Sequence, residues 1–264
     1  MPERTEYAPG TPSWVELITT DVEAAKDFYA KTFGWEYQVG PAETGHYVMA
    51  TTKGKGAAGL MAQPEPMAAA GMPSLWGAYV TVADLEGPLA AAEAAGGTVV
   101  RPPFDVMDIG RMAVLQDPAG AAVNLWEPRG NAGAEIVNEH GAFTWTDLLT
   151  PDPGAAADFY SAVFGWEVME TTQPGGASAR MFSLGGAPVA SASTPQMDGI
   201  PPHWHVYFAV DDADAAASAI SDGGGTVVAG PFDTPPGRML AAIDPTGAAF
   251  SIIALDPTFD PTAG

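Results

Sequence analysis

The fold is decided by a stretch that occurs twice, TPSWVELITTDVEAAKDFYAKTFGWEY at residues 11–37 and AFTWTDLLTPDPGAAADFYSAVFGWEV at residues 142–168. The two copies align without a gap, so that the first tryptophan, the FY pair and the FGW triplet fall in equivalent positions. Further along, the motifs GGTVV, PFD, GRM and DPxG recur in the same order in both halves. The chain is therefore an internal duplication whose halves differ by small loop insertions.

The duplication divides the chain into two domains of the same organisation. The segment PRGNAGAEIVNEHG, which follows the first half, has little apolar periodicity and several turn-forming residues, as linkers do. We expect a first domain at residues 9–128, a linker at residues 129–141 and a second domain at residues 142–256.

The composition favours a folded protein that avoids polyanions. Of the 264 residues 47% are hydrophobic, which is enough for one large core or two smaller ones. The 32 acidic and 10 basic residues give a formal charge of -22, which repels nucleic-acid phosphates and anionic lipids. We expect neither nucleic acid nor membrane as a partner. An acidic surface attracts cationic small molecules, although it is also compatible with a simply solvated face.

The absence of cysteine restricts the chemistry further. It excludes disulfides, thiolate nucleophiles and cysteine-ligated metals, so that any metal would need His, Asp or Glu. The N-terminal MPERTEYAPG lacks the pattern of a signal peptide, and no apolar run approaches the ~20 residues of a membrane span. These features predict a cytoplasmic protein.

Residue periodicity predicts the same series of elements in each half. Apolar and other residues alternate over residues 14–19, which is the period of a strand. Asp21 is suited to begin a helix that Gly34 ends. Residues 78–82 form a second strand-like run, followed by an Ala-rich helical segment and three further strands, the last two joined by DPAG. Each half thus contains two βαβββ modules.

These features resemble the vicinal-oxygen-chelate superfamily, which includes glyoxalase I, bleomycin-resistance proteins, fosfomycin-resistance enzymes and extradiol dioxygenases. The resemblance rests on AAKDFYAKTFGWE and AAADFYSAVFGWE and on the endings DPAGAAVNLWE and DPTGAAFSII, and it covers nearly the whole chain outside the linker and tails. Tandem forms of this kind look most like actinobacterial glyoxalase-like proteins. The resemblance implies an α+β fold in which paired βαβββ modules form cupped half-barrels, four modules in two tandem domains.

The resemblance also implies where members of the superfamily hold a metal. Those positions lie on the first strand of a module and on the last strand after the DPxG turn, and they correspond here to Trp14, Gly77, Asn124, Trp145, His205 and Ser251. Only His205 is a good metal ligand. We therefore expect no metal cofactor. The alternative is a divalent metal held around His205, since His203 and His205 share one strand face.

Strand parity independently predicts the lining of two cavities. One face of each central strand is continuously apolar and is expected to pack beneath helices, which leaves the other face to line a cavity. We call these faces the first cup, which carries Glu16, and the second cup, which carries Asp147. The predicted ligand-binding residues are Trp14, Glu16, Tyr79, Asn124, Trp126, Trp145, Asp147, His205, Tyr207 and Ser251. Tryptophan and tyrosine often fill cores instead, but a carboxylate on a packed face is costly unless it is solvated or paired.

Three of these residues are also candidates for acid-base chemistry, namely Glu16, Asp147 and His205. If Asp147 approaches His205, the carboxylate is expected to raise the pKa of the imidazole, with burial opposing that shift. Arg111 and Arg238 occupy equivalent positions before a strand and are expected to anchor their hairpins by ion pairing.

The sequence leaves several functions open. The first hypothesis is a metal-independent protein, similar to glyoxalase and bleomycin-resistance proteins, that binds a hydrophobic, aromatic or cationic small molecule for sequestration, resistance or an accessory role in secondary metabolism. The alternative is a glyoxalase- or hydroxylase-type enzyme, a lyase, isomerase or oxygenase, that uses His205 with Asp147 or Glu16, with or without a divalent metal. A third is an interaction protein with a collapsed cavity. Monomer and homodimer are both compatible with the sequence.

Overall fold

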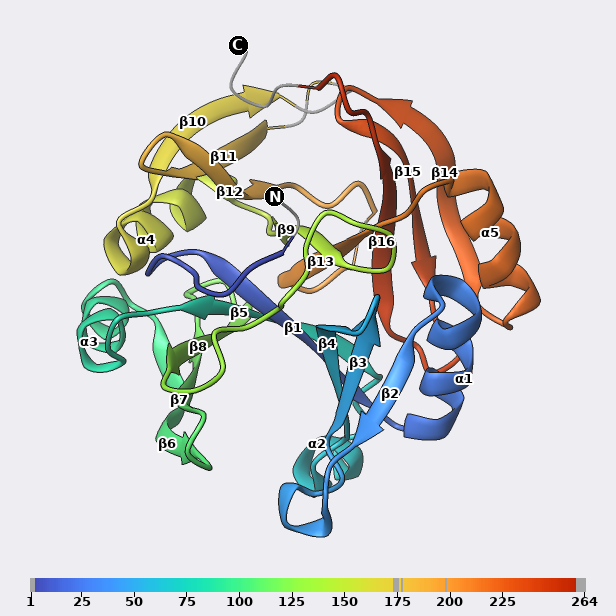
Figure 1. Cartoon of the computed structure of the whole chain (residues 1–264). Helices are drawn as coiled ribbons and strands as arrows, with labels where there is room; N and C mark the ends of the chain where they lie inside the picture. The colour runs from blue at the N-terminus through green and yellow to red at the C-terminus, as the bar shows by residue number, and fades with distance from the viewer. Residues whose placement is uncertain (1–2, 173–175, 177, 198, 260–264) are drawn as a thin grey trace.

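Four copies of the βαβββ module form the protein, as the sequence predicts (Figure 1). The computed structural model describes residues 3–172, 176, 178–197 and 199–259. The first module consists of β1 (Pro12–Thr19), α1 (Val22–Phe33), β2 (Glu36–Val39), β3 (Val48–Thr52) and β4 (Lys55–Ala62), with a short 3-10 turn, η1 (Ala42–Thr44), before β3. The second follows the short helix α2 (Glu65–Ala69) and consists of β5 (Leu75–Thr81), α3 (Glu86–Ala94), β6 (Thr98–Val106), β7 (Gly110–Gln116) and β8 (Ala122–Pro128).

The second half repeats this series. Its third module consists of β9 (Phe143–Leu149), α4 (Pro153–Phe164), β10 (Glu167–Thr172), β11 (Ser178–Leu184) and β12 (Ala187–Ser193). Its fourth consists of β13 (His203–Ala209), α5 (Ala213–Asp222), β14 (Thr226–Thr234), β15 (Gly237–Ile243) and β16 (Ala249–Leu255).

Two modules join edge to edge into one eight-stranded sheet in each half. The strand orders are β2-β3-β4-β1-β5-β8-β7-β6 and β10-β11-β12-β9-β13-β16-β15-β14. The first strands of paired modules, β1 with β5 and β9 with β13, run antiparallel at the centre of each sheet. The α+β fold class is therefore confirmed.

The first helix of each half begins and ends at the residues that the sequence predicts, an aspartate at its start and a glycine at its end. Asp21 accepts a hydrogen bond from the backbone N–H of Ala24, which caps α1 at its start. Gly34 ends α1 with φ of 69°, a left-handed conformation that glycine adopts without steric cost. Asp152 and Gly165 do the same for α4.

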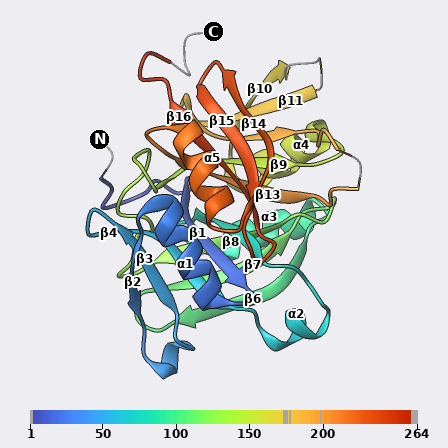
Figure 2. The same ribbon diagram turned by 90° about the vertical axis from the view of Figure 1, so that its right-hand side faces the viewer.

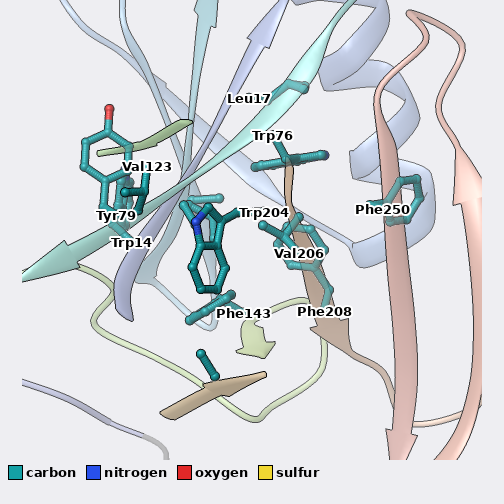
Figure 3. Close-up of a cluster of buried hydrophobic side chains, with 14 of the residues drawn as sticks. Trp14, Leu17, Trp76, Tyr79, Val123, Phe143, Trp204, Val206, Phe208 and Phe250 are labelled. Carbon is teal, nitrogen blue, oxygen red and sulfur yellow. The ribbon is translucent and has the colours of Figure 1, made fainter. Parts of the chain in front are cut away.

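The helices of one half pack against those of the other. Helix α1 lies beside α5 and α3 lies beside α4, as the views in Figures 1 and 2 agree. The side chains beneath them form one hydrophobic cluster that continues through both halves. Within it, Trp76 of β5 contacts Phe208 of β13 edge to face, with ring centroids 5.0 Å apart (Figure 3).

Two buried hydrogen-bond relays cross between the halves. The indole N–H of Trp76 donates to the Tyr29 hydroxyl at 2.9 Å, and that hydroxyl donates to Asp244 of the other half at 3.0 Å. The equivalent relay runs from Trp204 to Tyr160 at 3.0 Å and on to Asp117 at 3.1 Å. Each aspartate also accepts backbone N–H bonds from its own DPxG turn. Helix and turn of opposite halves are thereby fixed to each other.

The segment between β8 and β9 runs along the first half. The backbone N–H of Ala134 donates to the carbonyl of Ser13, that of Glu135 donates to the carbonyl of Gly56, and Ile136 is buried. None of the helices in the part of the chain that the structure describes is long and apolar enough to cross a membrane.

Removing one relay hydroxyl should destabilise the whole chain. Tyr29→Phe and Tyr160→Phe each leave a buried indole N–H and a buried carboxylate oxygen without their partner, so each should lower the free energy of unfolding by about 1.5–3 kcal/mol in urea denaturation. The control is Tyr37→Phe, whose hydroxyl bonds the Lys26 carbonyl of its own half and no other residue that the structure describes. This variant should cost about 0.5–1.5 kcal/mol. Equal losses for all three variants would contradict the assigned role.

Candidate functional site

The two cups are built from equivalent rows of residues across the centre of each sheet. One row contains Trp14, Tyr79 and Asn124 in the first sheet, and Trp145, Tyr207 and Ser251 in the second. The next row contains Gly59, Glu16 and Gly77 in the first sheet, and Ser191, Asp147 and His205 in the second. Strand register therefore places each carboxyl group at the same point of its cup.

In the first cup the carboxyl of Glu16 is held by two phenols. The Tyr79 hydroxyl donates to Oε1 at 2.9 Å, and the Tyr47 hydroxyl also bonds this carboxyl group. The indole N–H of Trp14 donates to the Tyr47 hydroxyl at 3.1 Å. A Cβ at Gly59 would overlap that hydroxyl, so glycine at this strand position makes room for Tyr47.

In the second cup two serines hold the carboxyl of Asp147. Ser191 donates to Oδ1 at 2.7 Å and Ser193 donates to Oδ2. The indole N–H of Trp145 donates to the Ser191 hydroxyl at 2.9 Å. Both cups thus contain a tryptophan bonded to a hydroxyl that is bonded to a carboxyl.

A single open cavity is lined by residues of both cups. Its lining includes Glu16, Gly77, Tyr79, Asn124, Trp145, Asp147, His205, Tyr207 and Ser251. Trp14 and Trp126 lie outside this lining, contrary to the expectation from strand parity. The Trp14 indole packs in the core against Tyr47, while the Trp126 indole turns away and donates to the Asn131 carbonyl at 2.8 Å.

Burial perturbs both carboxyl groups. Glu16 is 7% exposed and Asp147 is 6% exposed. Burial raises the pKa of Glu16, and the two phenol hydrogen bonds oppose the increase. Burial raises the pKa of Asp147 from 3.8 to about 6, although the two serine hydroxyls stabilise the carboxylate. A carboxyl group that titrates near neutrality is therefore available in the second cup.

The rise in the pKa of His205 that was expected if Asp147 approached the imidazole is not found. His205 faces Asp147 across β13 and β9, but its Nε2 lies 2.9 Å from the Ser251 hydroxyl, and both oxygens of Asp147 bond serines. Burial lowers the pKa of His205 from 6.5 to about 3, with a smaller contribution from His203. Burial therefore determines the pKa of His205, and the imidazole is neutral near pH 7. Its Nδ1 is buried without a hydrogen-bond partner among the described residues.

The sequence pattern of the Glyoxalase/Bleomycin resistance protein/Dioxygenase superfamily matches residues 11–125 and 142–252. The chain belongs to this superfamily. CFP32 of Mycobacterium tuberculosis, which is named provisionally as a glyoxylase, is 44% identical over 97% of this chain and 99% of its own length. The anthracycline biosynthesis protein DnrV of Streptomyces peucetius is 36% identical, with 98% of each chain covered.

Solved structures of the superfamily share the fold. The 2,3-dioxygenase LapB of Pseudomonas sp. KL28 superposes with a TM-score of 0.66 at 18% identity, over 97% of each chain. An Mn(II)-bound glyoxalase of Novosphingobium aromaticivorans superposes with a TM-score of 0.64 at 17% identity, over 96% of this chain and 86% of that chain.

Neither cup carries a full set of metal-ligand side chains at the positions where the superfamily resemblance implies them. In the first cup those positions hold Trp14, Gly77 and Asn124, of which none supplies an imidazole or carboxylate. In the second, His205 stands with Trp145 and Ser251. Among the residues that the structure describes, no three His, Asp or Glu side chains converge. This donor set does not fit a metal centre of the expected kind.

Sequence reasoning missed the hydroxyl groups that hold the carboxyls. Ser191 and Ser193 alternate on one face of β12, and that period of two was the available signal. Tyr47 precedes β3 and reaches Glu16 only because Gly59 leaves space for its side chain. No local sequence pattern indicates this contact. The ion pairs expected of Arg111 and Arg238 are confirmed: Arg111 bonds Glu86 and Glu127, and Arg238 bonds Asp214 and Asp233.

Asp147→Asn should remove one contribution to the pH dependence of stability. Because folding raises the pKa of Asp147, the native state binds a proton more tightly than the unfolded state does. The protonated carboxyl therefore contributes most to the free energy of unfolding below pH 4, and this contribution is lost as pH rises through about 6. Between pH 4 and 7.5, wild type should lose about 2–3 kcal/mol relative to Asp147→Asn in urea denaturation. The exposed Asp158→Asn is the charge-matched control. A difference between wild type and Asp147→Asn that does not change with pH would contradict the assignment.

Proposed function

We propose that the protein binds a planar aromatic small molecule carrying a positive charge, without a bound metal, and that the charged group sits beside Asp147 in the second cup. The proposed role is sequestration or an accessory step in secondary metabolism. One observation carries the proposal, namely that a buried carboxyl on the cavity wall has hydroxyl partners but no cationic partner among the described residues.

Such a carboxyl group is poised for a cation. Removing a carboxylate from water costs several kcal/mol unless an opposite charge or a proton compensates it. The two serine hydroxyls hold both oxygens in place, so an incoming ammonium group meets a carboxylate whose orientation is already fixed. Ring faces of aromatic residues in the same cavity, including Tyr207 and Trp145, offer further attraction to a cation or planar ring system.

The name of one relative supports the same class of ligand. DnrV is named for anthracycline biosynthesis. Anthracyclines combine fused aromatic rings with an amino sugar, which pairs a planar ring system with a positive charge. The donor set around His205 supports binding without a metal, since a single imidazole is a poor metal site.

The binding proposal is tested with two probes that differ in charge, 2-naphthylmethylammonium and the neutral 2-naphthylmethanol, titrated calorimetrically against the full-length protein. Wild type should prefer the cation, and its affinity should rise between pH 5 and pH 7.5 because the cation binds the ionised form of Asp147. Asp147→Asn should weaken cation binding about tenfold, which corresponds to ~1.4 kcal/mol, and leave alcohol binding nearly unchanged.

Two controls accompany this measurement. Asp158→Asn removes an exposed carboxylate of the same half and should leave both affinities unchanged. Treatment with a chelator should also change neither affinity. The proposal is wrong if both probes bind equally well, or if Asp147→Asn and Asp158→Asn behave alike.

A second function is favoured by one specific property of Asp147. A carboxyl group with a pKa of about 6 can accept a proton from carbon near neutral pH, which is the role of a general base in a glyoxalase- or hydroxylase-type enzyme. The neutral imidazole of His205 and the carboxyl of Glu16 would then be the other groups that take part in the acid-base chemistry. The assay is product formation from methylglyoxal and glutathione, with and without added divalent metal. Turnover that disappears in Asp147→Asn would favour catalysis, whereas the binding proposal expects only background.

A further inference from the structure

The two cups also differ where β6 and β14 border the cavity. The motif TVVRPPFD of β6 matches TVVAGPFD of β14, so that Arg101 in the first half corresponds to Ala229 in the second. The structure agrees, because Phe104 pairs with Met112 as Phe232 pairs with Met239. Arg101 and Ala229 both line the cavity, but only the first cup has a cation there.

Arg101, like Arg4, has no ion-pair partner in the part of the chain that the structure describes, and both line the cavity. The arginines at positions 111, 129, 180 and 238 each form an ion pair with a carboxylate. The guanidinium of Arg101 forms no ion pair or hydrogen bond with any residue that the structure describes, although the chain has 32 acidic residues. Its guanidinium carbon instead lies 3.7 Å from the centroid of the Phe104 ring. Stacking on a ring holds the guanidinium plane in place and leaves its N–H edge open.

The guanidinium also acts on the interior of the first cup. Burial is the main cause that raises the pKa of the Tyr79 hydroxyl, and the positive charge of Arg101 opposes the increase. Arg101 and Tyr79 both line the cavity. Asn124 also lines the cavity, and among the described residues its Nδ2 makes one long bond, at 3.4 Å to the Ala78 carbonyl. The guanidinium of Arg101 and the amide of Asn124 are thus two hydrogen-bond donors among the residues that line the cavity.

We infer that the first cup binds the carboxylate group of an aromatic ligand through the guanidinium of Arg101. The fork of the guanidinium matches two oxygens, and the apolar lining on β6 and β7, including Val100 and Met112, accommodates the ring. The two cups then select ligand groups of opposite charge, an anion beside Arg101 and a cation beside Asp147. This inference rests on the proposed function only in assuming that aromatic ligands enter the cavity.

The test uses 2-naphthoate, which shares its ring system with the cationic and neutral probes, and calorimetric titration of the full-length protein at pH 7.5. Wild type should bind 2-naphthoate more tightly than 2-naphthylmethanol, and added salt should weaken that binding. Arg101→Ala should raise the Kd for 2-naphthoate about tenfold or more. Arg101→Lys should restore affinity only in part, because an ammonium group lacks the planar fork. Binding of 2-naphthylmethylammonium should not weaken in either variant.

Arg129→Ala is the matched control, because it removes the same charge from an arginine of the same half that lies outside the cavity lining and is paired with Asp105. Its Kd for 2-naphthoate should stay within about twofold of wild type. The inference is overturned if Arg101→Ala and Arg129→Ala have equal effects, or if wild type does not prefer 2-naphthoate to the alcohol. Either result leaves the Asp147-dependent binding of the cation intact, so failure here is distinct from failure of the proposed function.

Discussion

The buried bond from each helix tyrosine to the DPxG aspartate of the opposite half is the constraint on which the rest of the structure depends. Tyr29 and Tyr160 each accept from an indole of their own half and donate to a carboxylate of the other. Because those aspartates also fold the turns before β8 and β16, one hydrogen bond fixes a helix, a turn and a central strand together. A buried polar group that lacks its hydrogen-bond partner is costly, so a network in which every group is bonded favours one arrangement of the two halves. The two halves share one hydrophobic core and are not independent domains joined only by a linker.

This arrangement determines which face of each sheet is free for a ligand. The helices and the aromatic cluster around Trp76 and Phe208 cover one face of the central strands, and strand alternation then directs Glu16, Asp147 and His205 to the other. The carboxyl groups consequently stand on rigid central strands and not on loops. Their orientation is set by register and by hydroxyl donors before any ligand arrives, which lowers the entropic cost of binding.

Much of this architecture was predictable from the sequence, for reasons that are local. The four modules follow from the repeat, the helix ends follow from Asp21 and Gly34, and the orientation of Glu16 and Asp147 follows from a period of two. The misses involve contacts between distant segments. Tyr47 reaches Glu16 across a position left empty by Gly59, and the side chain of Trp126 turns toward Asn131. The pKa of His205 is lowered mainly by burial, and only the three-dimensional structure shows how completely the imidazole is buried.

The divergence between the two halves is itself informative about the carboxyl groups. In the first cup the hydroxyl between Trp14 and Glu16 comes from Tyr47, which enters from outside the row over a glycine. In the second cup the hydroxyl between Trp145 and Asp147 comes from Ser191, which occupies the position of that glycine. The connectivity of indole, hydroxyl and carboxyl is the same although the residues and their lengths differ. Packing alone does not require this outcome, since an apolar side chain at either carboxyl position would avoid the desolvation cost altogether. Both halves therefore retain an oriented carboxyl group on the cavity wall. In the first cup it is surrounded by phenols and a guanidinium, and in the second by serines and a neutral imidazole. These surrounding groups distinguish the ligand groups that each cup accepts.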